Sequence, residues 1–325
     1  MAERNLSARR EERRRALRRR RLLAGLSAAA LGAAVAAIVV LAVGGGADRG
    51  VRGVSAARRV ADSRRAHSGG AGPAGPSSAG TRAGGPPGHA AVPILMYHVI
   101  APAPAGAPFP GLYVAPQEFA EQMHALRAAG WHAVTLDEVA ASWREGTSLG
   151  PGKPIVLSFD NGYQSQYTRA LPVLRDLGWV GVENMQLSGL PPSQGGLGEG
   201  EVRGLLAAGW ELDTQGYSHA DLVTLDAQAL HFQVADARRT LRQRYHVPVH
   251  WFCYPSGHYD ATVVQAVKAA GFQGSTTVVP GWARPGEDRY RLHRLRVLGG
   301  TSGSQLLELI RDTREAPSAP DSYTA

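Results

Sequence analysis

The sequence predicts an α/β domain with a parallel sheet, and three observations lead to this fold class. Apolar stretches of strand length alternate with helical stretches from Val92 onward. One of them, Pro154 to Ser158, is a short apolar run centred on β-branched residues, as in a strand that is buried on both faces. The composition also changes near residue 91, so the alternating pattern has a clear beginning. Alternation of this kind favours parallel strands joined by right-handed helical crossovers.

The N-terminal 43 residues predict a membrane anchor. Residues 1–21 contain ten Arg, and residues 22–43 follow without a single charge. As a helix, these 22 residues would be about 33 Å long, which is enough to cross a bilayer. The apolar run is longer than that of a cleaved signal peptide, which remains the alternative. The Arg-rich side is expected in the cytoplasm, so the rest of the chain is predicted to be extracytoplasmic.

Residues 44–91 predict a disordered linker, because they are dominated by Gly, Ala, Ser, Pro and Arg. Residues 1–90 hold 17 of the 35 Lys and Arg and only five acids, so the remaining chain carries a net charge of −4. The basic pI therefore comes from the N-terminal arm. We expect no nucleic-acid partner, because the folded part has no surplus of cations for phosphates.

Residues 92–313 form the predicted domain, and residues 314–325 a predicted disordered tail. The expected strands are 92–99, 154–160, 179–187, 210–215, 249–254, 273–279 and 291–298, and the expected helices are 116–129, 164–177, 199–208, 226–245, 260–270 and 302–312. The single cysteine, Cys253, excludes an intrachain disulfide and is expected to be a buried structural thiol. The oligomeric state is not predicted.

The strand at Lys153–Tyr163, KPIVLSFDNGY, places Asp160 at its C-terminal end, just before an Asn-Gly turn. Parallel α/β folds carry their chemistry at this edge of the sheet. A helix N-cap is the simpler alternative for Asp160 alone.

Four segments in order resemble the polysaccharide deacetylase family, the NodB-homology or carbohydrate esterase 4 type. They are VPILMYH at residues 92–98, SFDNG at 158–162, ELDTQGYSHADL at 211–222 and WFCYPSGHYD at 251–260. The resemblance spans about residues 92–312. It implies an irregular (β/α) barrel and hydrolysis of N-acetyl groups on a polysaccharide, with a divalent metal such as zinc or cobalt.

The resemblance also implies roles for individual residues. Asp160 matches the catalytic base and His219 the second metal-binding His. Asn161 stands where the family has a metal-binding Asp, and Gln215 where it has the first His. An amide oxygen is a much weaker zinc ligand than imidazole. Asp213 lies two residues before Gln215, so on a strand it would share the same face and could replace the lost ligand. A solvated carboxylate or a turn cap is the alternative.

The remaining candidates are less specific. His293 is the nearest candidate for the general acid, with a packing or surface histidine as the alternative, and the family's LPR-type segment implies that Arg294 helps to orient the site. Cys253 occupies the position where many members have an Arg that orients the base. His98 either points into the site or is a core histidine. The other expected members of the substrate groove are Tyr163, Tyr254, Pro255 and Gly257.

Two functions follow from these patterns. The first is a membrane-anchored deacetylase of a cell-wall glycan, such as peptidoglycan, that uses a metal-activated water and Asp160 as base. The second is a non-catalytic glycan-binding protein of the same fold that has lost its metal. Asp160 with Asn-Gly-Tyr favours the enzyme, and Gln215 with Cys253 favours the binding protein.

Overall fold

The computed structural model describes residues 88–188, 190 and 195–324. The predicted basic segment, membrane helix and nearly all of the linker therefore lie outside the described residues. Within the described part, none of the helices is long and apolar enough to cross a membrane.

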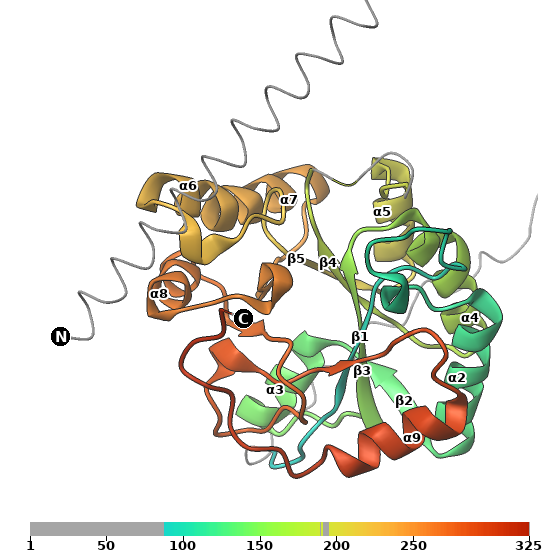
Figure 1. The fold of residues 1–325 in the computed structure, drawn as a ribbon. Helices are drawn as coiled ribbons and strands as arrows, with labels where there is room; N and C mark the ends of the chain where they lie inside the picture. Colours follow the sequence, from blue (N-terminus) through green and yellow to red (C-terminus); the bar gives the residue numbers. More distant parts are fainter. Residues whose placement is uncertain (1–87, 189, 191–194, 325) are drawn as a thin grey trace, which may run out of the picture. The chain divides into compact units, whose positions relative to one another are not determined.

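A curled parallel sheet forms the centre of the domain (Figure 1). Its strands are β1 (Ile94–Tyr97), β2 (Trp131–Val134), β3 (Lys153–Asn161), β4 (Val182–Met185), β5 (Glu211–Thr214), β6 (Trp251–Cys253), β7 (Gly274–Thr276) and β8 (Leu295–Arg296). The strand order is β7-β6-β5-β4-β3-β1-β8, and β2 pairs with the first half of β3. The predicted parallel α/β sheet is confirmed.

The two edges of the sheet approach each other through the segment that leads into β8. Leu292 forms a parallel bridge with Thr276 at the end of β7, and the Arg294 N–H donates to the Val279 carbonyl. A few residues later, Leu295 pairs with Leu95 of β1. This partial closure carries the Arg294 side chain across the barrel towards β3.

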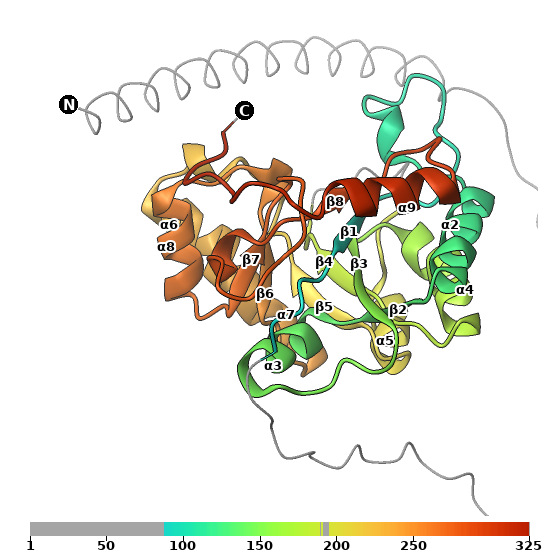
Figure 2. The same cartoon turned by 90° about the horizontal axis from the view of Figure 1, so that it is seen from below.

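Helices surround the sheet, as the two perpendicular views show (Figures 1 and 2). They are α2 (Pro116–Ala128), α3 (Leu136–Glu145), α4 (Leu171–Asp176), α5 (Glu199–Ala207), α6 (Ala227–His231), α7 (Ala237–Tyr245), α8 (Ala261–Ala269) and α9 (Gly303–Asp312). A π-helical turn, Phe232–Asp236, joins α6 to α7, so the predicted helix 226–245 is nearly continuous. Strand β2 and helix α3 were not predicted from the sequence.

Strand β3 is fully buried from Ile155 to Asn161, as its apolar run predicts. Phe159 packs among Tyr97, Phe119 and Trp210, with ring centroids 4.9 to 6.0 Å apart. These rings fix the β3 backbone just before Asp160, so the carboxyl end of the strand has a rigid base.

The C-terminal segment is not the disordered tail that the composition suggested. Tyr323 forms two backbone hydrogen bonds with Tyr259, at 2.8 and 2.9 Å, and the Tyr259 hydroxyl donates to the Pro320 carbonyl. The segment therefore covers the region that follows β6.

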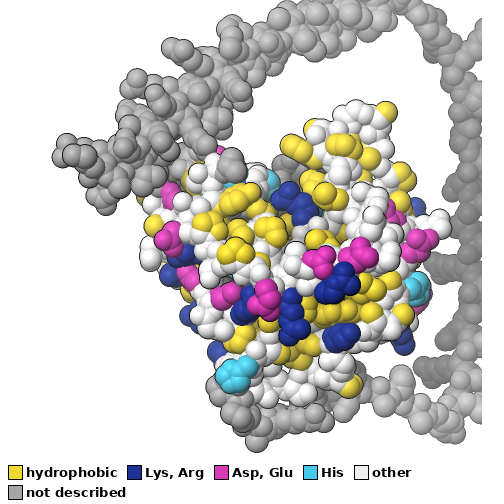
Figure 3. All heavy atoms as spheres, turned by 60° about the horizontal axis from the view of Figure 1, so that its bottom comes forward, with side chains coloured by type: hydrophobic (Ala, Val, Ile, Leu, Met, Phe, Trp, Pro, Cys, Tyr) yellow, Lys and Arg dark blue, Asp and Glu magenta, His cyan; other side chains and the backbone are white. Residues whose placement is uncertain are grey.

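A pocket of about 520 Å³ lies at the opposite, N-terminal edge of the sheet. Its walls include Trp131, Trp282 and Ile310, and Lys153 and Arg314 each lie over one of the indole rings. Figure 3 brings this side of the molecule forward and shows hydrophobic side chains next to Lys and Arg. The residues expected to perform chemistry lie at the other edge.

Candidate active site

A pocket of about 440 Å³ opens at the carboxyl ends of the strands. Its lining contains seven of the residues singled out from the sequence, namely His98, Asp160, Asn161, Tyr163, Gln215, His219 and Gly257. Met96, Phe109, Leu112, Gln186, Leu190, Ser218, Ser256, Val278 and Arg296 complete it. The structure thus brings together residues that are up to 200 positions apart in the chain.

The backbone around this pocket adopts unusual conformations. Four described residues other than glycine have a positive φ, and three of them line the pocket: Asn161 at 78°, His219 at 53° and Ser256 at 55°. Such conformations cost free energy and cluster at functional sites. Gly257, with φ of 75°, has no such cost, and a Cβ there would lie 2.3 Å from the Val278 side chain.

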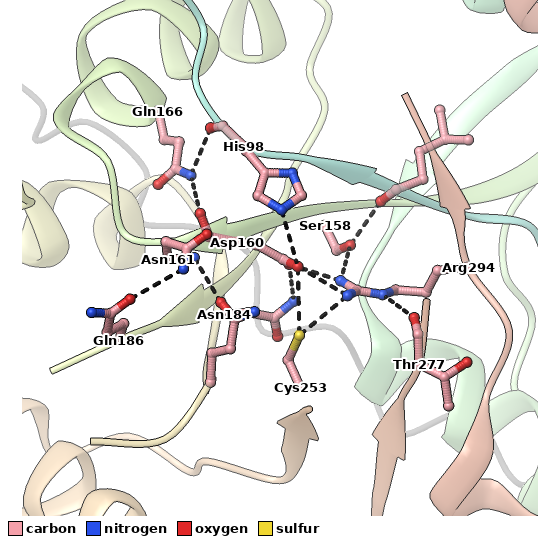
Figure 4. A network of polar contacts seen from close by, with 12 residues as sticks. His98, Ser158, Asp160, Asn161, Gln166, Asn184, Gln186, Cys253, Thr277 and Arg294 are labelled. Carbon is pink, nitrogen blue, oxygen red and sulfur yellow. Dashed lines mark hydrogen bonds and ion pairs between the residues drawn. The ribbon is translucent and has the colours of Figure 1, made fainter. Parts of the chain in front are cut away.

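Asp160 is the centre of a buried polar network (Figure 4). Its side chain is 1% exposed, and Arg294 binds both carboxylate oxygens, with Nη1–Oδ1 at 2.7 Å and Nη2–Oδ2 at 2.9 Å. Asn184 of β4 donates to Oδ1 at 2.9 Å, and the Cys253 thiol lies 3.5 Å from Oδ2. His98 approaches Oδ2 at 3.9 Å. Both oxygens therefore already have hydrogen-bond partners.

These contacts set the charge state of the network. Burial opposes ionisation of Asp160, but the facing Arg294 outweighs it and lowers the pKa of Asp160 to about 2. Burial lowers the pKa of His98 to about 4 despite the neighbouring carboxylate. Burial also raises the pKa of the Cys253 thiol well above its usual range. At neutral pH the network consists of one ion pair, a neutral imidazole and a thiol.

Arg294 is completely buried, and its guanidinium makes several further hydrogen bonds. Its Nε donates to the Thr277 carbonyl at 2.8 Å, and Nη1 also donates to the Ser158 hydroxyl at 3.2 Å. Nη2 lies 3.2 Å from Cys253 Sγ. The Arg294 guanidinium thus lies beside Cys253, the position where the resemblance implies an Arg.

Comparisons with known proteins agree with this architecture. A family model described as polysaccharide deacetylase matches residues 148–275, which include β3 to β6 and most of the pocket. Residues 148–275 thus resemble the polysaccharide deacetylase family.

Three similar proteins differ in how much of the chain they cover. The putative polysaccharide deacetylase YxkH of Bacillus subtilis is 28% identical over 215 residues, which are 66% of this chain and 74% of that protein. The Escherichia coli poly-beta-1,6-N-acetyl-D-glucosamine N-deacetylase is 42% identical over 62 residues, which are 19% of this chain and 9% of that protein. The Streptococcus pyogenes deacetylase PplD has the same fold, with a TM-score of 0.63 and 23% identity over 68% of this chain and 99% of that one.

The residues expected to bind metal do not form a metal site. The Gln215 side-chain oxygen accepts a hydrogen bond from the Asn161 N–H at 3.0 Å, and the Asn161 side-chain amide donates to Gln186 Oε1 at 3.1 Å. His219 is the only strong zinc donor of the three. Among the described residues, no cluster of three or more His, Cys, Asp or Glu could hold a metal. Two neutral amides and one imidazole, with one amide oxygen already bonded, do not fit zinc or cobalt.

Asp213 does not replace the lost ligand, which corrects the expectation from its spacing. It is fully buried, and its Oδ1 accepts the N–H groups of His250 and Trp251 at 3.0 and 2.8 Å, at the beginning of β6. Strand β5 ends at Thr214 and the chain turns at Gly216, where φ is 87°. Gln215 therefore lies beyond the strand, where side chains no longer alternate between the two faces of the sheet.

His293, Tyr254 and Pro255 also lie outside the pocket lining. His293 contacts Glu287 and donates to the Pro317 carbonyl, because side chains alternate along this segment and Arg294 and Arg296 take the inner face. The Tyr254 hydroxyl donates to the Tyr290 carbonyl within the core. The structure therefore does not place His293, Tyr254 or Pro255 in the pocket where a general acid and groove residues were expected.

Several residues of the pocket and of the Asp160 network were not predicted, although the sequence holds a signal for them. Asn184 and Gln186 occupy alternate positions at the end of a predicted strand, and Asn184 is in register with Asp160. Arg296 follows Arg294 by two residues on the same strand face. Phe109, in contrast, lies in a loop, where no periodicity could reveal it.

Asp213 belongs to a separate acidic pair with Glu211. The two carboxyl groups are close enough to share a hydrogen bond, and Glu211 also accepts the Asp137 N–H at 2.9 Å. Burial raises the pKa of Asp213 to about 6 and that of Glu211 well above its usual range. The pair therefore retains protons in the folded state at a pH where the unfolded chain has lost them.

This pair should make the folded state less stable as the pH rises from about 4 to about 6. The unfolded chain releases the Asp213 proton near pH 4 and the folded domain only near pH 6, so unfolding becomes easier across this window, by up to about 1.4 kcal/mol per pH unit. Urea unfolding between pH 4.5 and 8 should show a flatter profile for Asp213→Asn, which keeps the acceptor for both N–H groups. His98, whose pKa is lowered, acts in the opposite direction, so the difference between the two proteins is the relevant quantity. Parallel profiles would contradict the assignment.

Proposed function

We propose that the pocket at the carboxyl edge of the sheet binds an N-acetylated polysaccharide. Polar amides line one part of the pocket, and Met96, Phe109 and Leu112 provide an apolar wall. This mixture suits a sugar, which has both hydroxyl groups and apolar ring faces. The name of the Escherichia coli relative, which describes an N-acetylglucosamine polymer, supports an N-acetylated chain. A cell-wall glycan would be the substrate within reach if the predicted extracytoplasmic location holds.

We propose further that the pocket retains the glycan without metal-dependent hydrolysis. The observation that carries this proposal is the hydrogen bond from the Asn161 N–H to the Gln215 oxygen. It occupies the atom that would have to face a metal ion, and neither amide brings negative charge. The domain would then act as a binding protein with a deacetylase fold.

Deacetylation remains the second candidate because of one specific feature. Asp160 lies at the pocket, and Arg294 lowers its pKa to about 2, so at neutral pH it is an ionised carboxylate, available as a base although a weak one. Arg294 supplies the cation that Cys253 cannot. Release of an acetyl group would require a water molecule to reach a carboxylate that is 1% exposed.

The two candidates predict different results with N-acetylglucosamine tetramer as the probe. We expect the natural protein to bind it in a calorimetric titration and to release no acetate, with or without added zinc or cobalt. Phe109→Ala should weaken binding by about 3- to 10-fold, because it removes an aromatic contact worth about 1 kcal/mol. Phe109 is 69% exposed, so the change should leave the fold intact.

His124→Ala, an exposed change outside the pocket, is the matched control and should bind like the natural protein. Acetate release that disappears in Asp160→Asn would favour the deacetylase. Absence of binding and of acetate release would contradict both candidates.

A further inference from the structure

A second groove, of about 900 Å³, lies along α6 and α7 and is lined by basic side chains. Arg238, Arg239, Arg242, His231 and His246 face it, and no Asp or Glu is among its lining residues. Residues 91–325 contain 18 Lys and Arg against 22 Asp and Glu, yet four of the 18 lie within residues 238–244. Four cations of an otherwise acidic domain thus lie on one helix.

The guanidinium groups of this groove are only partly neutralised. Arg239 pairs with Asp236 at 2.8 Å, whereas Arg242 forms no ion pair with a described carboxylate. Arg238 is fixed by two backbone carbonyls, Val249 at 2.8 Å and Ala270 at 2.7 Å. Burial, followed by the charge of Arg242, lowers the pKa of Arg238. Arg238 and Arg242 therefore repel each other, and the charge of Asp213 opposes this effect at Arg238. Arg242 has no ion-pair partner among the described residues, so the groove favours an anionic ligand.

The same helix contacts the loop that lines the candidate active site. The Gln233 side-chain oxygen accepts the N–H groups of Tyr217 and Ser218, both at 3.0 Å, and its Nε2 donates to the Ser218 hydroxyl at 2.7 Å. Ser218 lines the pocket, and His231, two residues before Gln233, lines the groove. Phe232, which is 43% exposed, stacks on Tyr217 with centroids 4.3 Å apart. An aromatic pair thus stands where the pocket loop meets the groove helix.

We propose that the groove binds anionic groups of a polysaccharide chain whose N-acetylated unit occupies the pocket. This inference rests on the proposed function and adds the substrate class, a polymer that bears carboxylate or phosphate groups. A polymer suits both sites because the pocket and the groove share no lining residue, so one sugar unit does not fill both. A single nucleic-acid strand is less suitable, since the net charge of −4 repels a dense phosphate backbone.

The test uses two substitutions in the groove, Arg239→Gln and Arg242→Gln, combined in one protein. We expect the dissociation constant for polygalacturonate to rise at least ten-fold, because two charge-assisted contacts are lost. Binding of the N-acetylglucosamine tetramer should remain unchanged. Inorganic polyphosphate, measured in parallel, shows whether phosphate or carboxylate is preferred, and either preference supports the groove.

Arg169→Gln with Arg175→Gln is the matched control, since both residues are exposed, lie outside the groove and make the same change in charge. It should bind polygalacturonate like the natural protein. Equal weakening in both double variants, or none in the groove variant, would overturn the proposal, as would tighter binding of single-stranded DNA of equal charge. If the tetramer fails to bind while the groove variant still loses polygalacturonate, the pocket proposal fails and the groove stands as a polyanion site.

Discussion

Replacing Arg294 by methionine is expected to lower the free energy of unfolding by about 3 to 5 kcal/mol, the largest effect of any single change in the network. The Asp160 carboxylate would remain buried, without the cation that holds its pKa near 2. The Thr277 carbonyl and the Ser158 hydroxyl would also lose a donor. Urea unfolding at pH 7 of the natural and variant proteins measures this difference.

The double variant Asp160→Asn with Arg294→Met is the informative control. It removes both charges, and replacement of a whole buried ion pair often costs little. We therefore expect it to recover most of the lost stability. Asp160→Asn alone should also be destabilising, because Arg294 would then be the unpaired charge. If either single variant unfolds like the natural protein, the ion pair does not contribute as described.

Restoring the ligands that the family resemblance implies should create a metal site. We expect the double variant Asn161→Asp with Gln215→His to bind zinc about 10²-fold more tightly than the natural protein. The new carboxylate oxygen at position 161 and the new imidazole at position 215 would join His219 as zinc ligands. The hydrogen bond from the backbone N–H of residue 161 to the Gln215 side chain would also be lost. Isothermal titration with zinc, with bound metal counted by elemental analysis, gives the comparison.

Asp213→Asn is the control for the metal experiment and should leave zinc binding unchanged, since that carboxylate serves the amides of β6. A natural protein that already binds zinc as tightly as the double variant would show that the amide network opens to admit the ion. The deacetylase candidate would then regain its support.

Most of the fold could be predicted because local patterns specify it. Strand β3 has an apolar run bounded by turns, and helix α9 begins with a capping box at Ser302 and Gln305. Strand β2 escaped notice because it has four residues, three of which are only half-buried, so it lacks both a long apolar run and a clear alternation. Helix α3 could have been found, since Thr135 and Glu138 form a capping box.

The candidate site was predictable only where one strand determines it. Asp160 follows from the end of β3, and Asn161 and Gly162 follow from the turn. The contact between Asp160 and Arg294 joins residues 134 positions apart and depends on the curling of the sheet, which no local pattern contains. The hydrogen bond between Asn161 and Gln215 likewise depends on where β3 and β5, which lie on either side of β4, come to an end.

The position of Arg294 also has an evolutionary consequence. One guanidinium fits beside Asp160, and it can be supplied either from β6, at the position of Cys253, or from the strand that closes the barrel. A second arginine would be repelled by the first and would compete with it for the same space. Without either arginine, the Asp160 carboxylate would have no ion-pair partner. Relatives should therefore vary at these two positions together, with a small residue at one whenever arginine occupies the other.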